Sequence, residues 1–119
     1  MEFIIYFIIA LIVYFVIRNH FSNKAAKQIG TMELRGILKD KNKQFIDVRT
    51  SAEYKANHIK QFKNIPLHEL NSKASNLDQN KEVVVICQSG MRSSQAAKVL
   101  RKMGFNRITN VRGGMNTWR

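Results

Sequence analysis

One cysteine, one proline and eight acidic residues are all that this chain of 119 residues contains of these types. A single cysteine excludes an intrachain disulfide, and the lack of a second cysteine also excludes an internal disulfide relay. A reducing compartment would keep such a thiol free. Three scattered histidines and one cysteine do not make a metal site, so we expect neither a metal nor another cofactor.

Polar residues are missing from residues 3–17, an apolar run of fifteen. At about 1.5 Å per residue, a helix of that length covers about 22 Å and needs its flanking residues to approach the roughly 30 Å hydrocarbon core. A cleavable signal peptide is disfavoured, because no basic region precedes the run and no small-residue cleavage site follows it. A buried soluble helix is disfavoured because no face is polar. We therefore expect a transmembrane signal anchor over residues 1–21.

Basic residues are absent before the apolar run and frequent after it. Arg18, Lys24, Lys27 and Arg35 all follow it. The positive-inside rule therefore predicts a single-pass protein of the cell membrane, with the N-terminus outside and the C-terminal domain in the cytoplasm.

The scarcity of acidic residues leaves a formal net charge of +12, because 20 lysines and arginines face 8 aspartates and glutamates. The basic residues are scattered rather than clustered among aromatic residues, as nucleic-acid binding would require. A basic surface facing an anionic inner leaflet is the simpler interpretation, and nucleic acid is not expected as a partner.

The rest of the chain suffices for one modest domain. We expect a basic linker over residues 22–30 and a single domain over residues 31–119. Strand patterns alternate with helix patterns, which predicts an α/β fold with a mostly parallel sheet and a site at the carboxyl ends of its strands. The predicted strands are 45–48, a short one ending at 65, 83–86 and 107–111, and the predicted helices are 31–38, one starting near Thr50, 95–103 and a short last one.

The cysteine, Cys87, follows the four β-branched residues 83–86 and precedes a short polar loop with one glycine. A helix-forming stretch, 95–103, comes next. Unpaired N–H groups and the positive end of the helix dipole would then point at the sulfur, and Arg92 adds a positive charge. Such surroundings favour a thiolate, and we prefer this interpretation to that of an inert buried cysteine.

The spacing from Cys87 to Arg92 is C-x4-R, whereas cysteine phosphatases close their anion loop as C-x5-R. The smaller ring should suit one extra sulfur atom, or the end of thiosulfate, better than a phosphate ester. A phosphatase or arsenate reductase is therefore disfavoured, although activity on a phosphate ester or arsenate would revive it.

Five short motifs follow one another through most of residues 30–119. They are Phe45-Ile46-Asp47-Val48-Arg49, Glu53-Tyr54 with His58-Ile59, Asn64-Ile65-Pro66, Cys87-Gln88-Ser89-Gly90-Met91-Arg92-Ser93, and Gly113-Gly114-Met115-Asn116-Thr117-Trp118. In this order they resemble the rhodanese family of sulfurtransferases, specifically its small single-domain type. The sequence departs from the family in two places: Asn57 stands where the family usually has glycine, and the loop 59–63 differs. No catalytic position is lost by these changes.

The resemblance implies a rhodanese-like fold and a two-step reaction in which a persulfide forms on the cysteine and is passed to an acceptor. Cys87 is then the nucleophile, and the backbone N–H groups of the active-site loop should hold the outer sulfur. The members of that loop are Gln88, Ser89, Gly90, Met91 and Arg92. Arg92 either contacts an anionic donor or braces the loop, while Asp47 and Arg49 are expected to support it.

The predicted function is membrane-anchored sulfur transfer from thiosulfate or a persulfide donor to a thiol, cyanide or a protein acceptor. The alternative is a tethered persulfide relay or protein-interaction module with little turnover on small molecules. An intact loop does not separate the two, but turnover with small donors would.

Overall fold

The computed structural model describes residues 1–22 and 26–119, in which helices and strands alternate after an N-terminal helix. The elements are α1 (Glu2–Ser22), β1 (Lys27–Ile29), α2 (Thr31–Ile37), β2 (Lys43–Asp47), α3 (Ser51–Ala56), β3 (Lys63–Asn64), α4 (Leu70–Lys73), β4 (Glu82–Ile86), α5 (Met91–Lys102), β5 (Ile108–Val111) and α6 (Gly114–Thr117). Turns of 3-10 helix, Leu67–Glu69 and Ala74–Asn76, flank α4. The predicted α/β alternation is confirmed.

The five strands form one sheet in the order β1-β5-β4-β2-β3, and every pair is parallel. Asp47, the last residue of β2, lies opposite Ile86, the last residue of β4. Cys87 therefore leaves the sheet at the same edge as Val48 and Arg49. The expected place of the site, at the carboxyl ends of the strands, follows from this register.

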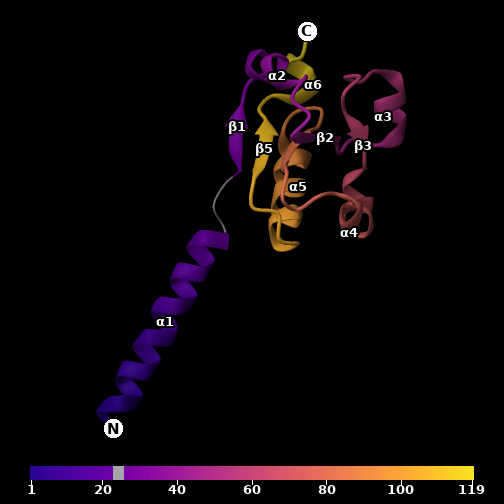
Figure 1. The fold of residues 1–119 in the computed structure, drawn as a ribbon. Coiled ribbons are helices and arrows are strands. Elements are labelled where there is room, and N and C mark those ends of the chain that lie inside the picture. Colours follow the sequence, from indigo (N-terminus) through magenta and orange to yellow (C-terminus); the bar gives the residue numbers. More distant parts are fainter. Residues whose placement is uncertain (23–25) are drawn as a thin grey trace.

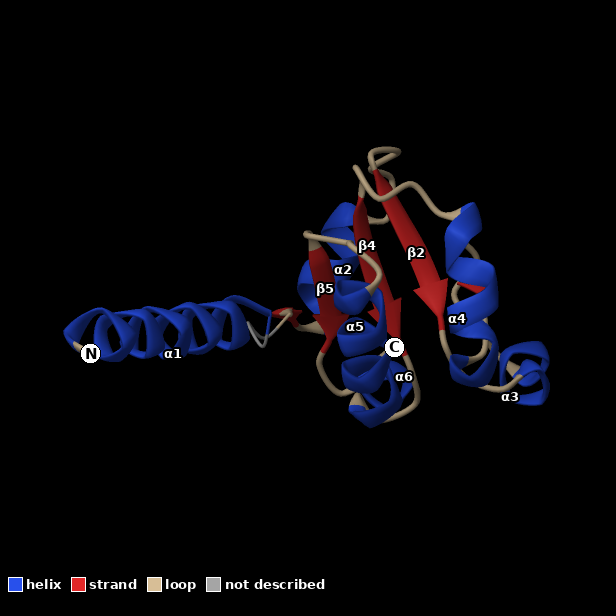
Figure 2. Cartoon of the chain, turned by 90° about the horizontal axis from the view of Figure 1, so that it is seen from below, coloured by secondary structure: helices blue, strands red, loops and turns tan. Residues whose placement is uncertain are grey.

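The core lies on both faces of the sheet, because successive side chains of a strand point to opposite faces. On one face, Val83 and Val85 pack in a cluster that includes Leu100 of α5 and Leu70 of α4. On the other face, Val84 and Ile86 pack in a cluster with residues of α2 and α6. Figure 2 shows β2, β4 and β5 side by side among these helices. The central strand is thus buried on both sides, as its run of β-branched residues predicts.

Two helix starts show how far local sequence sets the structure. The predicted capping box of α3 is present, since Thr50 accepts the N–H of Glu53 and the Glu53 carboxylate accepts the N–H of Thr50. The predicted start of α5 near Gln95 is wrong, because the helix begins at Met91. Gly90, at φ +106°, turns the chain directly into the helix without a side-chain cap, so no capping residue marks the start.

The range 22–30, predicted as a linker, contains a strand. Residues 27–29 form β1, which pairs with Thr109, Asn110 and Val111 at the edge of the sheet. Ile29 is the single buried residue of β1, so the strand is too short to show a hydrophobic pattern. Residues 23–25, including Lys24 of the predicted orientation signal, lie outside the described residues.

The N-terminal helix, α1, extends away from the sheet, with the two termini at opposite ends of the molecule (Figure 1). Its apolar side chains are exposed, from Phe3 at 87% to Leu11 at 42%. Among the residues that the structure describes, no helix has both the length and the apolar character that crossing a membrane demands. The predicted transmembrane anchor over residues 1–21 is not supported by this finding.

Candidate active site

Cys87 lies immediately after β4, fully buried in the core cluster that α5 covers. The N–H of Gly90 donates a hydrogen bond to Cys87 Sγ at 2.9 Å. The Ser93 hydroxyl, in the first turn of α5, lies 3.4 Å from the same sulfur. The end of β4 and the start of α5 therefore bring the Gly90 N–H and the Ser93 hydroxyl to one sulfur atom.

These donors favour the ionised form of the sulfur. Burial raises the pKa of the Cys87 thiol, because a thiolate loses solvation in the interior. Hydrogen bonds from the Ser93 hydroxyl and from the N–H groups of Ser93, Gly90 and Ser89 lower it by more. The net result is a Cys87 pKa below its ordinary value, which increases the thiolate fraction at neutral pH.

The active-site loop is held by backbone hydrogen bonds from the start of α6. The N–H of Met115 donates to the carbonyl of Cys87 at 2.8 Å, and that of Asn116 donates to the carbonyl of Gln88 at 2.9 Å. Gly114 permits this approach, because its backbone is at φ +55° and lies against the same carbonyls. Sequence reasoning recognised the Gly-Gly pair as part of a motif but did not connect it with the loop.

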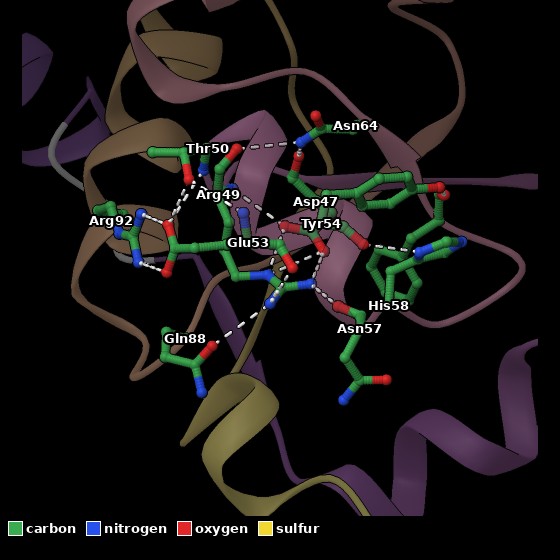
Figure 3. Close-up of polar contacts among 11 residues, drawn as sticks. Asp47, Arg49, Thr50, Glu53, Tyr54, Asn57, His58, Asn64, Gln88 and Arg92 are labelled. Carbon is green, nitrogen blue, oxygen red and sulfur yellow. Dashed lines mark hydrogen bonds and ion pairs between the residues drawn. The ribbon is translucent and has the colours of Figure 1, made fainter.

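Arg92 points to Glu53 and forms a bidentate ion pair with it (Figure 3). The two guanidinium nitrogens lie 2.6 and 2.9 Å from the two carboxylate oxygens. The hydrogen bonds from Arg92 lower the pKa of Glu53 to about 2, helped by the bonds from Thr50. The same carboxylate therefore caps α3 and holds the first turn of α5. Of the two roles left open for Arg92, this geometry favours bracing the loop.

Replacing Glu53 with glutamine should lower the free energy of unfolding by about 1 kcal/mol, because both the capping box and the bidentate pair lose their charge. Urea denaturation of the variant measures this loss. Glu69→Gln serves as the control, since Glu69 forms an exposed pair with Lys73 at 3.1 Å and should change the stability by less than about 0.5 kcal/mol. Equal losses in the two variants would contradict the special role of Glu53.

A second buried pair lies at the end of β2. Arg49 donates to both carboxylate oxygens of Asp47 at 2.8–3.1 Å, and both side chains are at most 3% exposed. Arg49 also donates to Gln88 Oε1 at 3.3 Å, and Gln88 Nε2 donates to Asn116 Oδ1 at 2.6 Å. This chain of contacts, shown in part in Figure 3, connects the end of β2 with the active-site loop and α6. Asp47 and Arg49 are thus connected to the loop through Gln88, and their supporting role stays a prediction.

The structure brings the predicted site residues together around the loop and adds others. Met91, by contrast, is 73% exposed and starts α5 with its side chain toward solvent. Sequence reasoning missed Ser93, although its position six residues after Cys87, within the first turn of a helix that starts at Met91, would have placed it beside the sulfur. His58 Nδ1 lies at hydrogen-bond distance, 2.8 Å, from the carbonyl oxygen of Tyr54, and the imidazole stacks on the Tyr54 ring. These contacts give His58 a structural role.

The family model for the rhodanese-like domain matches residues 31–119, which hold every element from α2 to α6. The chain belongs to the rhodanese family. The expected family and its α/β fold, with a parallel sheet flanked by helices, are thereby confirmed, but not the transmembrane helix that was expected before the domain.

Three similar proteins illustrate the relationship. The chain is 40% identical to YrkF of Bacillus subtilis (strain 168) over 79 residues, which cover 66% of this chain and 43% of YrkF. It is 29% identical to the thiosulfate sulfurtransferase GlpE of Coxiella burnetii (strain RSA 493 / Nine Mile phase I), over 78% of this chain and 87% of that protein. A rhodanese-like domain protein from Staphylococcus aureus has a crystal structure that matches with a TM-score of 0.72 and 32% identity, over 78% of this chain and 91% of that one.

The relatives of this chain thus include a thiosulfate sulfurtransferase, and the chain itself carries one cysteine, which directly follows β4. The expected enzyme class, a sulfurtransferase of rhodanese type, is confirmed at the level of the family. The chain spans less than half the length of YrkF.

Proposed function

We propose that this rhodanese carries sulfur as a persulfide on Cys87, taking it from thiosulfate or a persulfide donor and passing it to a thiol, cyanide or a protein acceptor. The observation that carries the proposal is the single Cys87 sulfur at a strand end, with the N–H of Gly90 at 2.9 Å and the Ser93 hydroxyl at 3.4 Å. A low-pKa thiolate in such a loop is a competent nucleophile.

In this reaction every bond that forms replaces one that breaks, so no external oxidant or reductant takes part. The Cys87 thiolate attacks the outer sulfur of thiosulfate, the S–S bond of thiosulfate breaks, and sulfite leaves with the electron pair. An acceptor thiolate or cyanide then attacks the outer sulfur of the Cys87 persulfide, and the Cys87 thiolate leaves in turn. The N–H groups that stabilise the thiolate at both ends of this cycle are those of Ser89, Gly90 and Ser93.

A persulfide relay to a protein partner is the second candidate, and the pairing of the nearby arginines favours it. Arg92 is bonded to Glu53 and Arg49 to Asp47, so both guanidinium groups at the loop are already neutralised. A thiosulfate dianion gains less from a paired guanidinium than from a free one, whereas the persulfide group of a donor carries at most one negative charge at the reacting sulfur. Turnover with small donors decides between an enzyme for thiosulfate and a relay fed by persulfides.

Mass spectrometry of the intact protein tests the proposal directly. Incubation of the full chain with thiosulfate, or separately with glutathione persulfide, is expected to add one sulfur atom to Cys87, and cyanide or a thiol should remove it. Loading by the persulfide alone would favour the relay. Loading by neither donor would refute transfer from small donors and leave only a relay fed by a protein partner, or a binding module.

We propose further that α1 attaches the domain to the cell membrane, with the domain on the cytoplasmic side and the N-terminus outside. The exposed apolar side chains on every side of α1 support an apolar environment for this helix. A hydrophobic stretch shorter than the bilayer is accommodated by thinning of the bilayer and by snorkelling of flanking residues, such as Arg18. The excess of basic residues after the apolar run supports the orientation.

Fractionation of cells that express the full chain with an N-terminal tag tests this attachment. The protein should remain in the membrane fraction after an alkaline wash, and a protease added outside intact cells should remove the tag. Ile9→Lys combined with Ile12→Lys should release it, because a lysine in the apolar core costs about 2.5–3.5 kcal/mol. Met32→Lys, a change of an exposed apolar residue within the domain, is the control. A tag that resists external protease would contradict the crossing, and release by alkaline wash would contradict insertion.

A further inference from the structure

A group of buried polar side chains lies beside the active-site loop, between α5 and the edge of the sheet. Ser93 is fully buried and Asn110, on β5, is 3% exposed. The Ser93 hydroxyl is hydrogen-bonded to Asn110 Oδ1, and Asn110 Nδ2 donates to Gln28 Oε1 at 3.0 Å and to Ser94 Oγ at 3.2 Å. Because a buried amide costs stability unless it is satisfied, these bonds hold Asn110 in one orientation with its oxygen toward Ser93.

The Ser93 hydroxyl has one hydrogen and three acceptors within reach. These are Cys87 Sγ at 3.4 Å, the Gly90 carbonyl at 3.1 Å and Asn110 Oδ1. A Cys87 thiol can donate its own hydrogen to Ser93 Oγ, which leaves the Ser93 hydrogen for Asn110. A Cys87 thiolate can only accept, so Ser93 must turn its hydrogen toward the sulfur and away from Asn110. Asn110 and the thiolate therefore compete for the same hydrogen.

We propose that Asn110 is a positioning residue that controls, through this competition, whether the Ser93 hydroxyl donates to Cys87 Sγ. While Cys87 is a thiol, the Asn110 amide oxygen accepts the hydrogen of the Ser93 hydroxyl, and this hydrogen bond opposes ionisation of the thiol. Gln28, on β1, takes part by binding the amide nitrogen, which fixes the amide oxygen toward Ser93. This inference deepens the proposed function, since it assigns a group that sets the reactivity of the proposed nucleophile.

The charged groups around Cys87 stay in place when Asn110 changes. From α5, Arg92 acts on the sulfur, and its charge is balanced by Glu53 of α3. From the end of β2, Asp47 and Arg49 neutralise each other. Neither ion pair contains a partner of Asn110, so a change in titration that follows its replacement reports on the Ser93 hydrogen bond.

Titration of the thiolate by its ultraviolet absorbance tests the proposal without any sulfur donor. Cys87 is the only cysteine of the chain. The difference in absorbance between each protein and its Cys87→Ser counterpart therefore comes from this thiolate. The titration is carried out on the full chain in mild detergent. Asn110→Leu should lower the midpoint pH of the Cys87 titration by about half to one pH unit, because the Ser93 hydrogen becomes available to the thiolate. Asn110→Ala, which inserts no larger side chain, should shift it in the same direction.

A double-mutant cycle separates positioning from a general structural effect. Ser93→Ala should raise the midpoint, and Asn110→Leu added to Ser93→Ala should cause no further shift. Thr109→Val is the matched control, since Thr109 is equally buried on β5 but bonds Glu82, and it should leave the midpoint unchanged.

An unchanged or raised midpoint in both Asn110 variants would overturn the proposal. So would an equal shift with and without the Ser93 hydroxyl. Because no sulfur donor takes part, these results stand apart from the success or failure of sulfur transfer. A protein that shows the expected shifts but accepts no sulfur would refute the proposed function and retain the role of Asn110.

Discussion

Replacing Cys87 with serine is expected to abolish sulfur transfer altogether. A serine hydroxyl has a far higher pKa than a thiol and cannot form a persulfide, so neither step of the proposed cycle remains. The serine oxygen fits the space of the sulfur and can keep the hydrogen bonds with Gly90 and Ser93, so the fold should persist. Sulfur release from thiosulfate and from a small persulfide, followed as sulfite or thiol production, measures the loss.

Two further measurements make this result specific. Circular dichroism should show the same secondary structure as the original protein, and urea unfolding should stay cooperative. Ser89→Ala is a variant of the same loop that retains Cys87, and it should still take up one sulfur atom. Wild-type transfer by Cys87→Ser would show that another group carries the sulfur.

Replacing Gly114 with alanine is expected to have the second large effect, on both the loop and the stability. An added Cβ would lie 2.9 Å from the carbonyl oxygen of Gln88 and closer still to that of Cys87, and the backbone is at φ +55°. Backbone atoms cannot yield as a flexible side chain can, so the bonds from Met115 and Asn116 to the loop should break. We expect a loss of about 3 kcal/mol in unfolding free energy and a more than tenfold slower sulfur uptake.

Gly36→Ala is the matched control for this prediction. Gly36 lies in α2, and an added Cβ there would meet nothing within 4 Å. Alanine is the better helix former, so this variant should be as stable as the original or more stable by about 0.5–1 kcal/mol. Urea denaturation and the rate of sulfur uptake, compared in the two variants, check the prediction. Normal uptake by Gly114→Ala would show that the contact of α6 with the loop is dispensable.

Local sequence signals predicted the parts of the site that lie close together along the chain. The β-branched run before Cys87 specifies a strand, and the glycine after it specifies a turn. The capping box at Thr50 and Glu53 specifies the start of a helix. Patterns of this kind depend on backbone conformation and burial, which a short segment of chain expresses by itself.

The partners of those residues could not be predicted in the same way. Glu53 meets Arg92 across 39 positions, and Asn110 meets Gln28 across 82. These contacts arise because parallel strands bring separate segments to one edge of the sheet, in a register that no single segment contains. Short β1 illustrates the same limit, since one buried residue makes no pattern until β5 supplies its hydrogen bonds.

Sequence alone thus determined the family, the alternation of strands and helices, and the place of the one cysteine directly after a strand, since each depends on residue type and local order. The tertiary structure decided how that cysteine is surrounded. Three contacts depend on distances between elements: the ion pair of Arg92 with Glu53, the packing of the active-site loop against Gly114, and the hydrogen bond of Ser93 with Asn110. Hydrogen bonds and ion pairs act over a few ångströms, so they exist only after packing has set those distances.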